Sequence, residues 1–291
     1  MRKTAFCIIA AGVLAVAAAC SRTASHGESH ARSIAVSIEP LRALLEPLAS
    51  GRFDVTCVMD RGADPENYEP SMSGRMAVDD SEAFFCTGGL PFEQSLADAA
   101  PSSVLKVSML DAVTPLYGTH DNCGHAHAHT HGAPDPHIWC SARNARAMAA
   151  AMASALSRLD PEGAPLYAAR LDSMTAAIDS LDRYLQNTLR SAAARSFMVW
   201  HPSLSYIARD YGLQQVALGA EGKDFSAAGL KAAIDRARAA GSRVFFVQRG
   251  LDSRQAAGVC REAGAAIVEI DPMSYNWQSQ LKTIADEIAR H

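Results

Sequence analysis

Residues 33–59 read SIAVSIEPLRALLEPLASGRFDVTCVM, and this stretch decides the fold class. It opens on a short apolar run, SIAVSI, that is typical of a buried strand. The segment EPLRALLEPLAS then has the composition and leucine spacing of a helix. A second apolar run, FDVTCVM, follows it directly. A strand, a helix and a strand of these lengths predict two parallel strands joined by a crossover helix.

The same alternation continues through both halves of the chain. We expect strands at 33–38, 53–59, 83–87 and 104–108, and again at 196–200, 213–218, 242–247 and 265–270. Helical segments separate them, at 39–50, 73–81, 91–100, 203–210, 226–240, 253–263 and 276–289. The pattern therefore predicts an α/β protein of two lobes, 33–140 and 195–291, each a mainly parallel sheet flanked by helices.

The region between the lobes, 141–194, has no strand signal. Apolar residues recur there at steps of three and four and predict a helix about 40 Å long; they are Tyr167, Leu171, Met174, Ile178, Leu181, Leu185 and Leu189. The alternative is a dimerising coiled coil. The flanking positions are mostly uncharged and Thr188 interrupts the seam, so we favour a helix that bridges the two lobes.

The amino terminus has the features of an export signal. A positive start, Met1-Arg2-Lys3, precedes an apolar run that ends at Ala19, which predicts a signal peptide over 1–19. The cysteine at position 20 follows three alanines and resembles a bacterial lipobox, so we expect Cys20 to be lipidated and 20–32 to form a polar tether. The alternative is an ordinary cleaved signal with an incidental cysteine.

Composition excludes one class of partner. The formal net charge is −4 and aromatic residues make up 7% of the chain, so neither a basic footprint nor base stacking supports nucleic-acid binding. Five cysteines remain after the leader and Cys20, and an odd number leaves at least one unpaired; they are Cys57, Cys86, Cys123, Cys140 and Cys260. Two of them, Cys57 and Cys86, end apolar runs. We expect these two to be buried free thiols on neighbouring strands, with a disulfide as the alternative.

A histidine-rich loop spans 117–136. Its histidines are spaced by glycine, alanine and threonine, and such tracts are typical of metal binding; they are His120, His125, His127, His129 and His131. Ordering a flexible loop costs entropy, so we expect a weak, multiple secondary site that Cys123 can join. The alternative is a solvated linker.

Four further polar residues stand at places where α/β proteins bind ligands. His201 follows the strand SFMVW, and Asp271 follows the strand AAIVEI. The carboxyl ends of parallel strands face the ligand crevice. His137 stands in Asp-Pro-His-Ile-Trp before a helix, and Glu66 stands in a turn-rich stretch after the second strand. Together they predict two ligands from each lobe at an interlobe site, with structural roles as the alternative.

These motifs resemble the zinc- and manganese-type substrate-binding proteins of bacterial ABC importers. The resemblance covers about 33–290 and implies four metal ligands, at 66, 137, 201 and 271. Two positions depart from the family pattern, because Glu66 replaces a usual histidine and Gln248 a usual glutamate. The resemblance implies a monomeric lipoprotein of the cell envelope, facing the periplasm or the outer side of the cytoplasmic membrane. It would capture metal with high affinity and deliver it to an ABC permease.

The expected ion is zinc, with manganese as the alternative. Imidazole ligands suit zinc, whereas the added carboxylate of Glu66 shifts the site towards harder ions. A zinc hydrolase would need an open coordination position and a general base. The chain has no His-Glu-x-x-His, Gly-x-Ser-x-Gly or Walker motif, so we expect no enzyme. A surface adhesin that binds macromolecules is the remaining alternative, but it would leave the paired strand-end ligands unexplained.

Overall fold

The computed structural model describes residues 32–117, 132–218, 227–248 and 253–291. The predicted signal peptide, Cys20, Cys123 and the five loop histidines lie outside the described residues. Within the described ranges, no helix is both long and apolar enough to cross a membrane.

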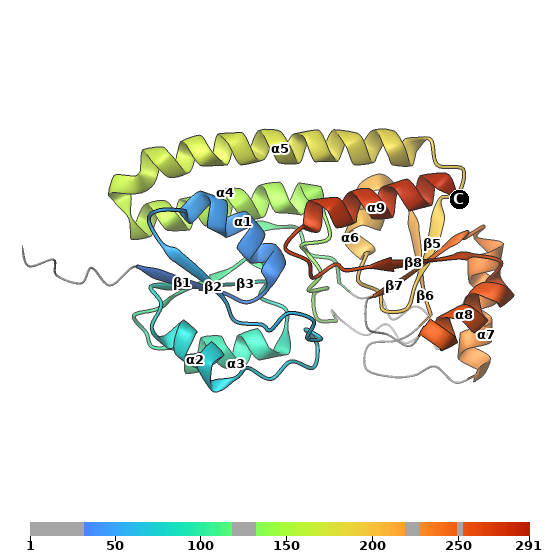
Figure 1. Ribbon diagram of the computed structural model, residues 1–291, viewed down its shortest axis with the longest axis horizontal. Helices are drawn as coiled ribbons and strands as arrows, with labels where there is room; N and C mark the ends of the chain where they lie inside the picture. Colours follow the sequence, from blue (N-terminus) through green and yellow to red (C-terminus); the bar gives the residue numbers. More distant parts are fainter. Residues whose placement is uncertain (1–31, 118–131, 219–226, 249–252) are drawn as a thin grey trace, which may run out of the picture. The chain divides into compact units, whose positions relative to one another are not determined.

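The first sheet has four parallel strands in the order β2–β1–β3–β4. The strands are β1 (Ser33–Val36), β2 (Asp54–Cys57), β3 (Ala83–Cys86) and β4 (Leu105–Ser108). The helices between them are α1 (Glu39–Ala49), α2 (Met72–Asp79) and α3 (Pro91–Ala99), followed after β4 by the short helix η1 (Leu110–Ala112). Figure 1 shows α1 on one face of the sheet and α2 and α3 on the other. Because both faces are covered, β3 is buried along its whole length.

The second sheet repeats this arrangement in the order β6–β5–β7–β8, again with every strand parallel. The strands are β5 (Ser196–Val199), β6 (Gln214–Ala217), β7 (Val244–Gln248) and β8 (Ala266–Ile270). The helices are α6 (Ser205–Tyr211), α7 (Ala227–Ala239), α8 (Ser253–Ala263) and α9 (Trp277–Arg290). In Figure 1, α7 and α8 lie on one side of the sheet and α6 and α9 on the other. The predicted fold class, two parallel sheets flanked by helices, is confirmed.

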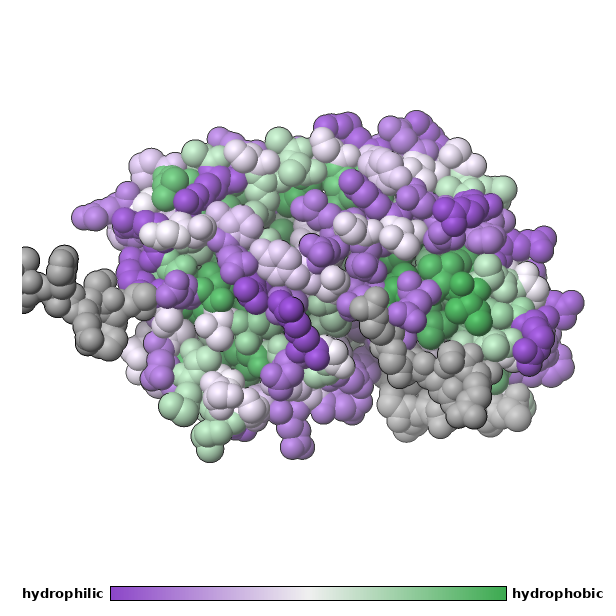
Figure 2. Space-filling view, in the orientation of Figure 1, coloured by the Kyte–Doolittle hydropathy of each residue, from purple (hydrophilic) through white to green (hydrophobic). Residues whose placement is uncertain are grey.

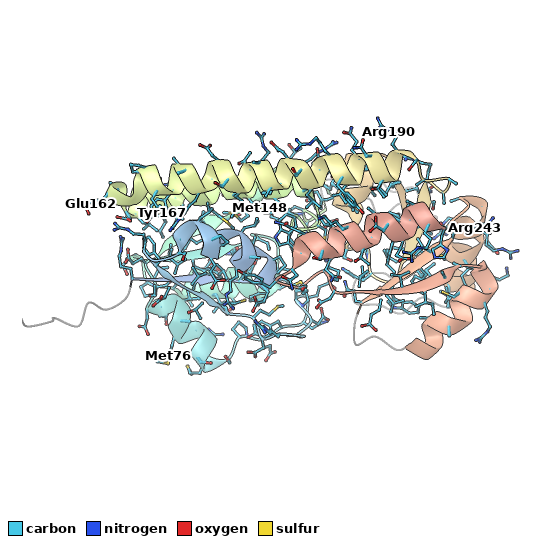
Figure 3. The ribbon with its side chains drawn as sticks, turned by 45° about the horizontal axis from the view of Figure 1, so that its top comes forward. Met76, Met148, Glu162, Tyr167, Arg190 and Arg243 are labelled. Atoms are coloured by element: carbon cyan, nitrogen blue, oxygen red, sulfur yellow. The ribbon has the colours of Figure 1, made fainter. Side chains whose placement is uncertain are left out.

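Two helices lie between the sheets in sequence, α4 (Ala142–Leu159) and α5 (Ala164–Arg190), with the short helix η2 (Pro161–Gly163) between them. Figure 3 labels Tyr167 near one end of α5 and Arg190 at the other, and the helix runs alongside both lobes. Five of its seven predicted apolar residues are buried and Leu171 and Met174 are partly buried; the helix packs within this chain, mainly on α4 and α9. The seam is therefore occupied within the chain, and the bridging helix rather than the coiled coil is the observed structure.

The expected placement of Cys57 and Cys86 on neighbouring strands was wrong. Strand β1 pairs with both β2 and β3 and so lies between the two cysteines. Cys57 is half-buried and Cys86 is buried, and both are free. Burial raises the pKa of the Cys57 thiol to about 12, so this thiol stays protonated and unreactive at neutral pH. The preference for free thiols is confirmed for both residues.

The outer side of β8 has no strand partner among the described residues, because β8 ends the second sheet. Its side chains alternate between more and less exposed, and Ile267 is 45% exposed. Figure 2 shows hydrophobic surface over this strand.

Candidate metal centre

Three of the four predicted ligands come together between the lobes. The ligand atoms of Glu66, His137 and His201 all lie within 4.8 Å of one another. His201 Nε2 is 2.9 Å from Glu66 Oε1 and 3.1 Å from His137 Nε2. Zinc–nitrogen bonds of about 2.0–2.1 Å in a tetrahedral shell place neighbouring donors roughly 3.3 Å apart. The two pairs that include His201 therefore already have the spacing of ligands to a single ion.

His201 is positioned by the second sheet. It comes two residues after β5, a fully buried strand flanked by β6 and β7. The Ser203 amide donates a hydrogen bond to the His201 carbonyl at 2.8 Å, which turns the chain into α6. The imidazole consequently stands at the carboxyl end of a central parallel strand, where such sheets present ligand-binding residues.

His137 is buried and is held by Asp135. The carboxylate Oδ1 of Asp135 accepts hydrogen bonds from the His137 backbone amide at 2.9 Å and from Nδ1 at 2.7 Å. Because an ionised carboxylate can only accept, the ring proton is placed on Nδ1. This tautomer directs the Nε2 lone pair of His137 at the site, and it is the arrangement usual for a metal-binding histidine.

The charge of Asp135 is stabilised by the same contacts. Burial on its own would raise the pKa of this carboxyl group, but the hydrogen bonds and charge of His137, together with a bond from Ser205, hold the pKa below its usual value. Sequence reasoning missed the role of Asp135. The sequence did contain a signal for this role, because Asp135 stands two residues before the candidate ligand His137. At this spacing an aspartate side chain can accept a hydrogen bond from the backbone amide two residues further on.

Glu66 is presented by a turn that follows β2. The Asp64 carboxylate accepts hydrogen bonds from the Glu66 amide at 3.1 Å and the Asn67 side chain at 2.7 Å. The Tyr68 hydroxyl group donates to the Val58 carbonyl at 2.9 Å and ties the turn to the end of the strand. The Glu66 side chain is 25% exposed, so water can reach the site from this side.

The two imidazoles face each other through nitrogen atoms. With the proton of His137 on Nδ1, its Nε2 is an acceptor that points at His201 Nε2. Two lone pairs at 3.1 Å repel unless a proton or a cation lies between them. A single proton on His201 Nε2 satisfies both His137 and Glu66, and a divalent cation can replace it.

The fourth predicted ligand, Asp271, is not in this group of donors. It follows β8, and its backbone amide donates to Gln280 Oε1 at 2.9 Å. The neighbouring Pro272 carbonyl accepts a hydrogen bond from Trp139 Nε1 at 3.1 Å. The segment that carries Asp271 is therefore tied to the His137 segment, although the carboxylate itself is not among the clustered atoms.

The other departure from the family pattern, Gln248, contacts the same region. Its side-chain amide donates a hydrogen bond at 3.3 Å to the Oγ atom of Ser203, which comes two residues after His201. A carboxylate at this position could only accept a hydrogen bond from the hydroxyl group, and it would bring a negative charge that the amide lacks.

Comparison with known proteins identifies the family of the chain. Residues 34–290 match the family model described as "Zinc-uptake complex component A periplasmic". The chain belongs to this family. The crystal structure of a ZnuA superposes with a TM-score of 0.79 at 30% sequence identity, covering 89% of this chain and 98% of the other.

Curated relatives agree with this assignment. A Treponema pallidum relative named for metal binding is 25% identical, over 95% of this chain and 91% of its own length. The manganese-binding lipoprotein MntA of Halalkalibacterium halodurans is 24% identical, over 75% of this chain and 71% of its own length. The family resemblance drawn from the sequence motifs is thus confirmed.

Proposed function

We propose that this protein captures a divalent transition metal, zinc in preference to manganese, and delivers it to an ABC permease for uptake. The observation that carries the proposal is the cluster of Glu66, His137 and His201, whose donor atoms lie within 4.8 Å of one another. Membership of a periplasmic zinc-uptake family supports a metal-binding role for this cluster. The family is a substrate-binding component of transport and not an enzyme, which removes the zinc hydrolase alternative.

We propose Asp271 as the fourth ligand. The Trp139–Pro272 hydrogen bond keeps its segment beside His137, so a change in the carboxylate rotamer, rather than a new fold, would bring it to the ion. Two carboxylates would neutralise the charge of the cation, which offsets the cost of removing the ion from water. Four protein ligands would close the shell, as is usual for sites without a reacting water.

The choice of zinc rests on the two imidazoles, because nitrogen ligands suit zinc and carboxylates suit manganese. Manganese stays the alternative, since one relative is named for it. The five histidines of the loop are proposed to add weak equivalents beyond the first. They lie outside the described residues.

We further propose an exported, monomeric lipoprotein anchored through Cys20. The periplasmic family and a relative named as a lipoprotein support this arrangement. Nothing among the described contacts favours the adhesin alternative over the metal site.

The test is metal content together with chelator competition. Protein purified without added metal should carry about one tight equivalent of zinc. His137→Ala and His201→Ala should each weaken binding more than about 100-fold, because loss of a direct ligand should exceed the 10–100-fold cost of losing an outer-shell partner. His291→Ala is the matched control, since this histidine follows α9 and pairs with Glu287 at 3.6 Å. Wild-type affinity in both site variants would refute the interlobe site.

A further inference from the structure

We infer that Tyr206 is a positioning residue for the metal centre: its hydroxyl group fixes the Asp135 backbone and so sets His137 against His201. The inference rests on the proposed metal site. It concerns a side chain that does not touch the ion.

The Tyr206 hydroxyl group closes a small ring of hydrogen bonds. It donates to the Asp135 carbonyl at 2.8 Å and accepts from the Leu116 amide at 3.1 Å. The Asp135 amide in turn donates to the Leu116 carbonyl at 2.7 Å. The Tyr206 side chain is fully buried, so water cannot easily replace the hydroxyl group. Both backbone polar groups of Asp135 are thus fixed within one ring.

The ring controls the direction of the Asp135 carboxylate. That carboxylate holds His137 through two hydrogen bonds, to the backbone and to Nδ1. The Tyr206 hydroxyl group of α6 therefore acts on the one residue that orients His137.

A closed path links the two imidazoles. Tyr206 comes five residues after His201 on the segment that leaves β5. Its hydroxyl group reaches Asp135, Asp135 reaches His137, and His137 Nε2 returns to His201 Nε2 at 3.1 Å. A ligand pair whose two members are held by one hydrogen-bonded path keeps its spacing without the ion, and this preorganisation lowers the cost of binding.

The helix itself does not depend on this hydroxyl group. Arg209, one turn further along α6, donates to the Thr114 carbonyl at 3.0 Å and to Asn144 Oδ1 at 3.1 Å. Its guanidinium also lies 4.9 Å from the centre of the Tyr206 ring. Tyr206→Phe keeps the aromatic ring and its contact with Arg209, so the variant should fold and lose only the hydrogen bonds of the hydroxyl group.

The experiment compares Tyr206→Phe with Tyr211→Phe. Tyr211 is a buried tyrosine on the same helix, but its hydroxyl group donates to Asp182 of α5 at 2.7 Å. Tyr206→Phe should weaken zinc binding roughly tenfold, the lower end of the range for outer-shell partners, and Asp135→Asn roughly 10–100-fold. Tyr211→Phe should leave zinc affinity close to wild type. Circular dichroism and thermal unfolding verify that each variant is folded.

Two readouts separate positioning from general stability. The d–d absorption of Co²⁺ bound in place of zinc reports ligand geometry and should shift in Tyr206→Phe but not in Tyr211→Phe. Tyr206→Phe added to Asp135→Asn should cost little more than Asp135→Asn alone, because the tyrosine acts through the aspartate.

Several outcomes would overturn the inference. They are wild-type zinc affinity and cobalt spectrum in Tyr206→Phe, an equal loss in Tyr211→Phe, or additive losses in the double variant. If Tyr206→Phe does not fold, Asp135→Asn tests the residue through which the tyrosine acts, and unchanged zinc affinity there would overturn the inference too. Wild-type protein that binds no zinc would instead refute the proposed function.

Discussion

At the scale of single residues, Glu66 is where this chain departs from the histidine that its family resemblance implies. Its carboxylate lies 2.9 Å from His201 Nε2. A carboxylate oxygen is a harder donor than an imidazole nitrogen and can bind through two oxygens, which manganese tolerates better than a tetrahedral zinc site. We therefore expect Glu66 to moderate the preference for zinc.

Replacing Glu66 tests this expectation. Glu66→His should raise the ratio of zinc affinity to manganese affinity. Glu66→Ala should weaken the binding of both ions, by more than the roughly 10–100-fold cost of losing an outer-shell partner. The measurement is competitive binding of the two metals to each variant. Glu69→Ala, an exposed carboxylate of the same turn, is the control and should match wild type. An unchanged metal ratio in Glu66→His, with Glu66→Ala silent, would show that Glu66 is not a ligand.

Sequence alone could point to His137 and His201 because strand ends and restricted turns are recognisable along the chain. It could not find Asp135 or Tyr206 as supporting residues, since their roles depend on hydrogen bonds between segments 71 residues apart. For Asp271, the position could be predicted from the sequence but the direction of the side chain could not. Its position after β8 was predictable, but the direction of its carboxylate depends on how Gln280 and Trp139 hold the turn.

At the scale of elements, the junction of α4 and α5 is held by a buried carboxylate. Asp160 ends α4 and accepts two hydrogen bonds from Arg52, at 2.7 and 2.6 Å, and one from the Tyr167 hydroxyl group at 2.5 Å. Gly163 leaves room for this contact, because a Cβ there would collide with Asp160 and the Tyr167 ring. Arg52 belongs to the turn before β2, so the network fixes the start of the bridging helix to the first lobe.

This network predicts a pH dependence of folding. The hydrogen bonds from Arg52, and then from Tyr167, hold the pKa of Asp160 well below its usual value. A depressed pKa in the folded state contributes stability above the unfolded value, about 3.9, and that stability is lost as the pH falls further. Asp160→Asn should therefore lower the urea midpoint of the metal-free protein at pH 7, and the gap to wild type should narrow below about pH 4.

The control for this prediction is Asp172→Asn, an exposed aspartate on α5. Its urea midpoint should follow wild type at every pH. A gap between Asp160→Asn and wild type that stays constant from pH 7 to pH 3 would contradict a role for the charge and leave only a packing role.

Elements were predictable where periodicity was strong. All eight strands are present with ends within about two residues of expectation, and α5 was visible from its apolar steps. The order of strands in each sheet could not be inferred from neighbours in sequence, since β1 lies between β2 and β3. That single fact separates Cys57 from Cys86, because strand order is a tertiary property that local composition does not record.

At the scale of the whole molecule, contacts at several places join the lobes away from the three clustered donors. Tyr275, which follows β8, donates to Glu46 Oε2 of α1 at 2.7 Å, and the Arg42 guanidinium lies 5.7 Å from its ring centre. Trp139 bonds the Pro272 carbonyl, and α5 packs along α4 and α9. With a bridging helix on one side and ligands from both lobes on the other, we expect the two lobes to unfold together.

Zinc should therefore stabilise the protein as one unit. A ligand whose free concentration is about 1,000 times its dissociation constant stabilises the folded state by about 4 kcal/mol. For a chain of this size, that stabilisation raises Tm by roughly 10 °C. Calorimetry in a zinc buffer should show a single transition that moves by this amount and returns with EDTA. His201→Ala should keep the metal-free Tm near wild type and lose most of the shift, because the ion loses one of its direct ligands and binds more weakly. If zinc instead moves one of two resolved transitions and leaves the other in place, the lobes unfold separately and the ion is held by only one of them.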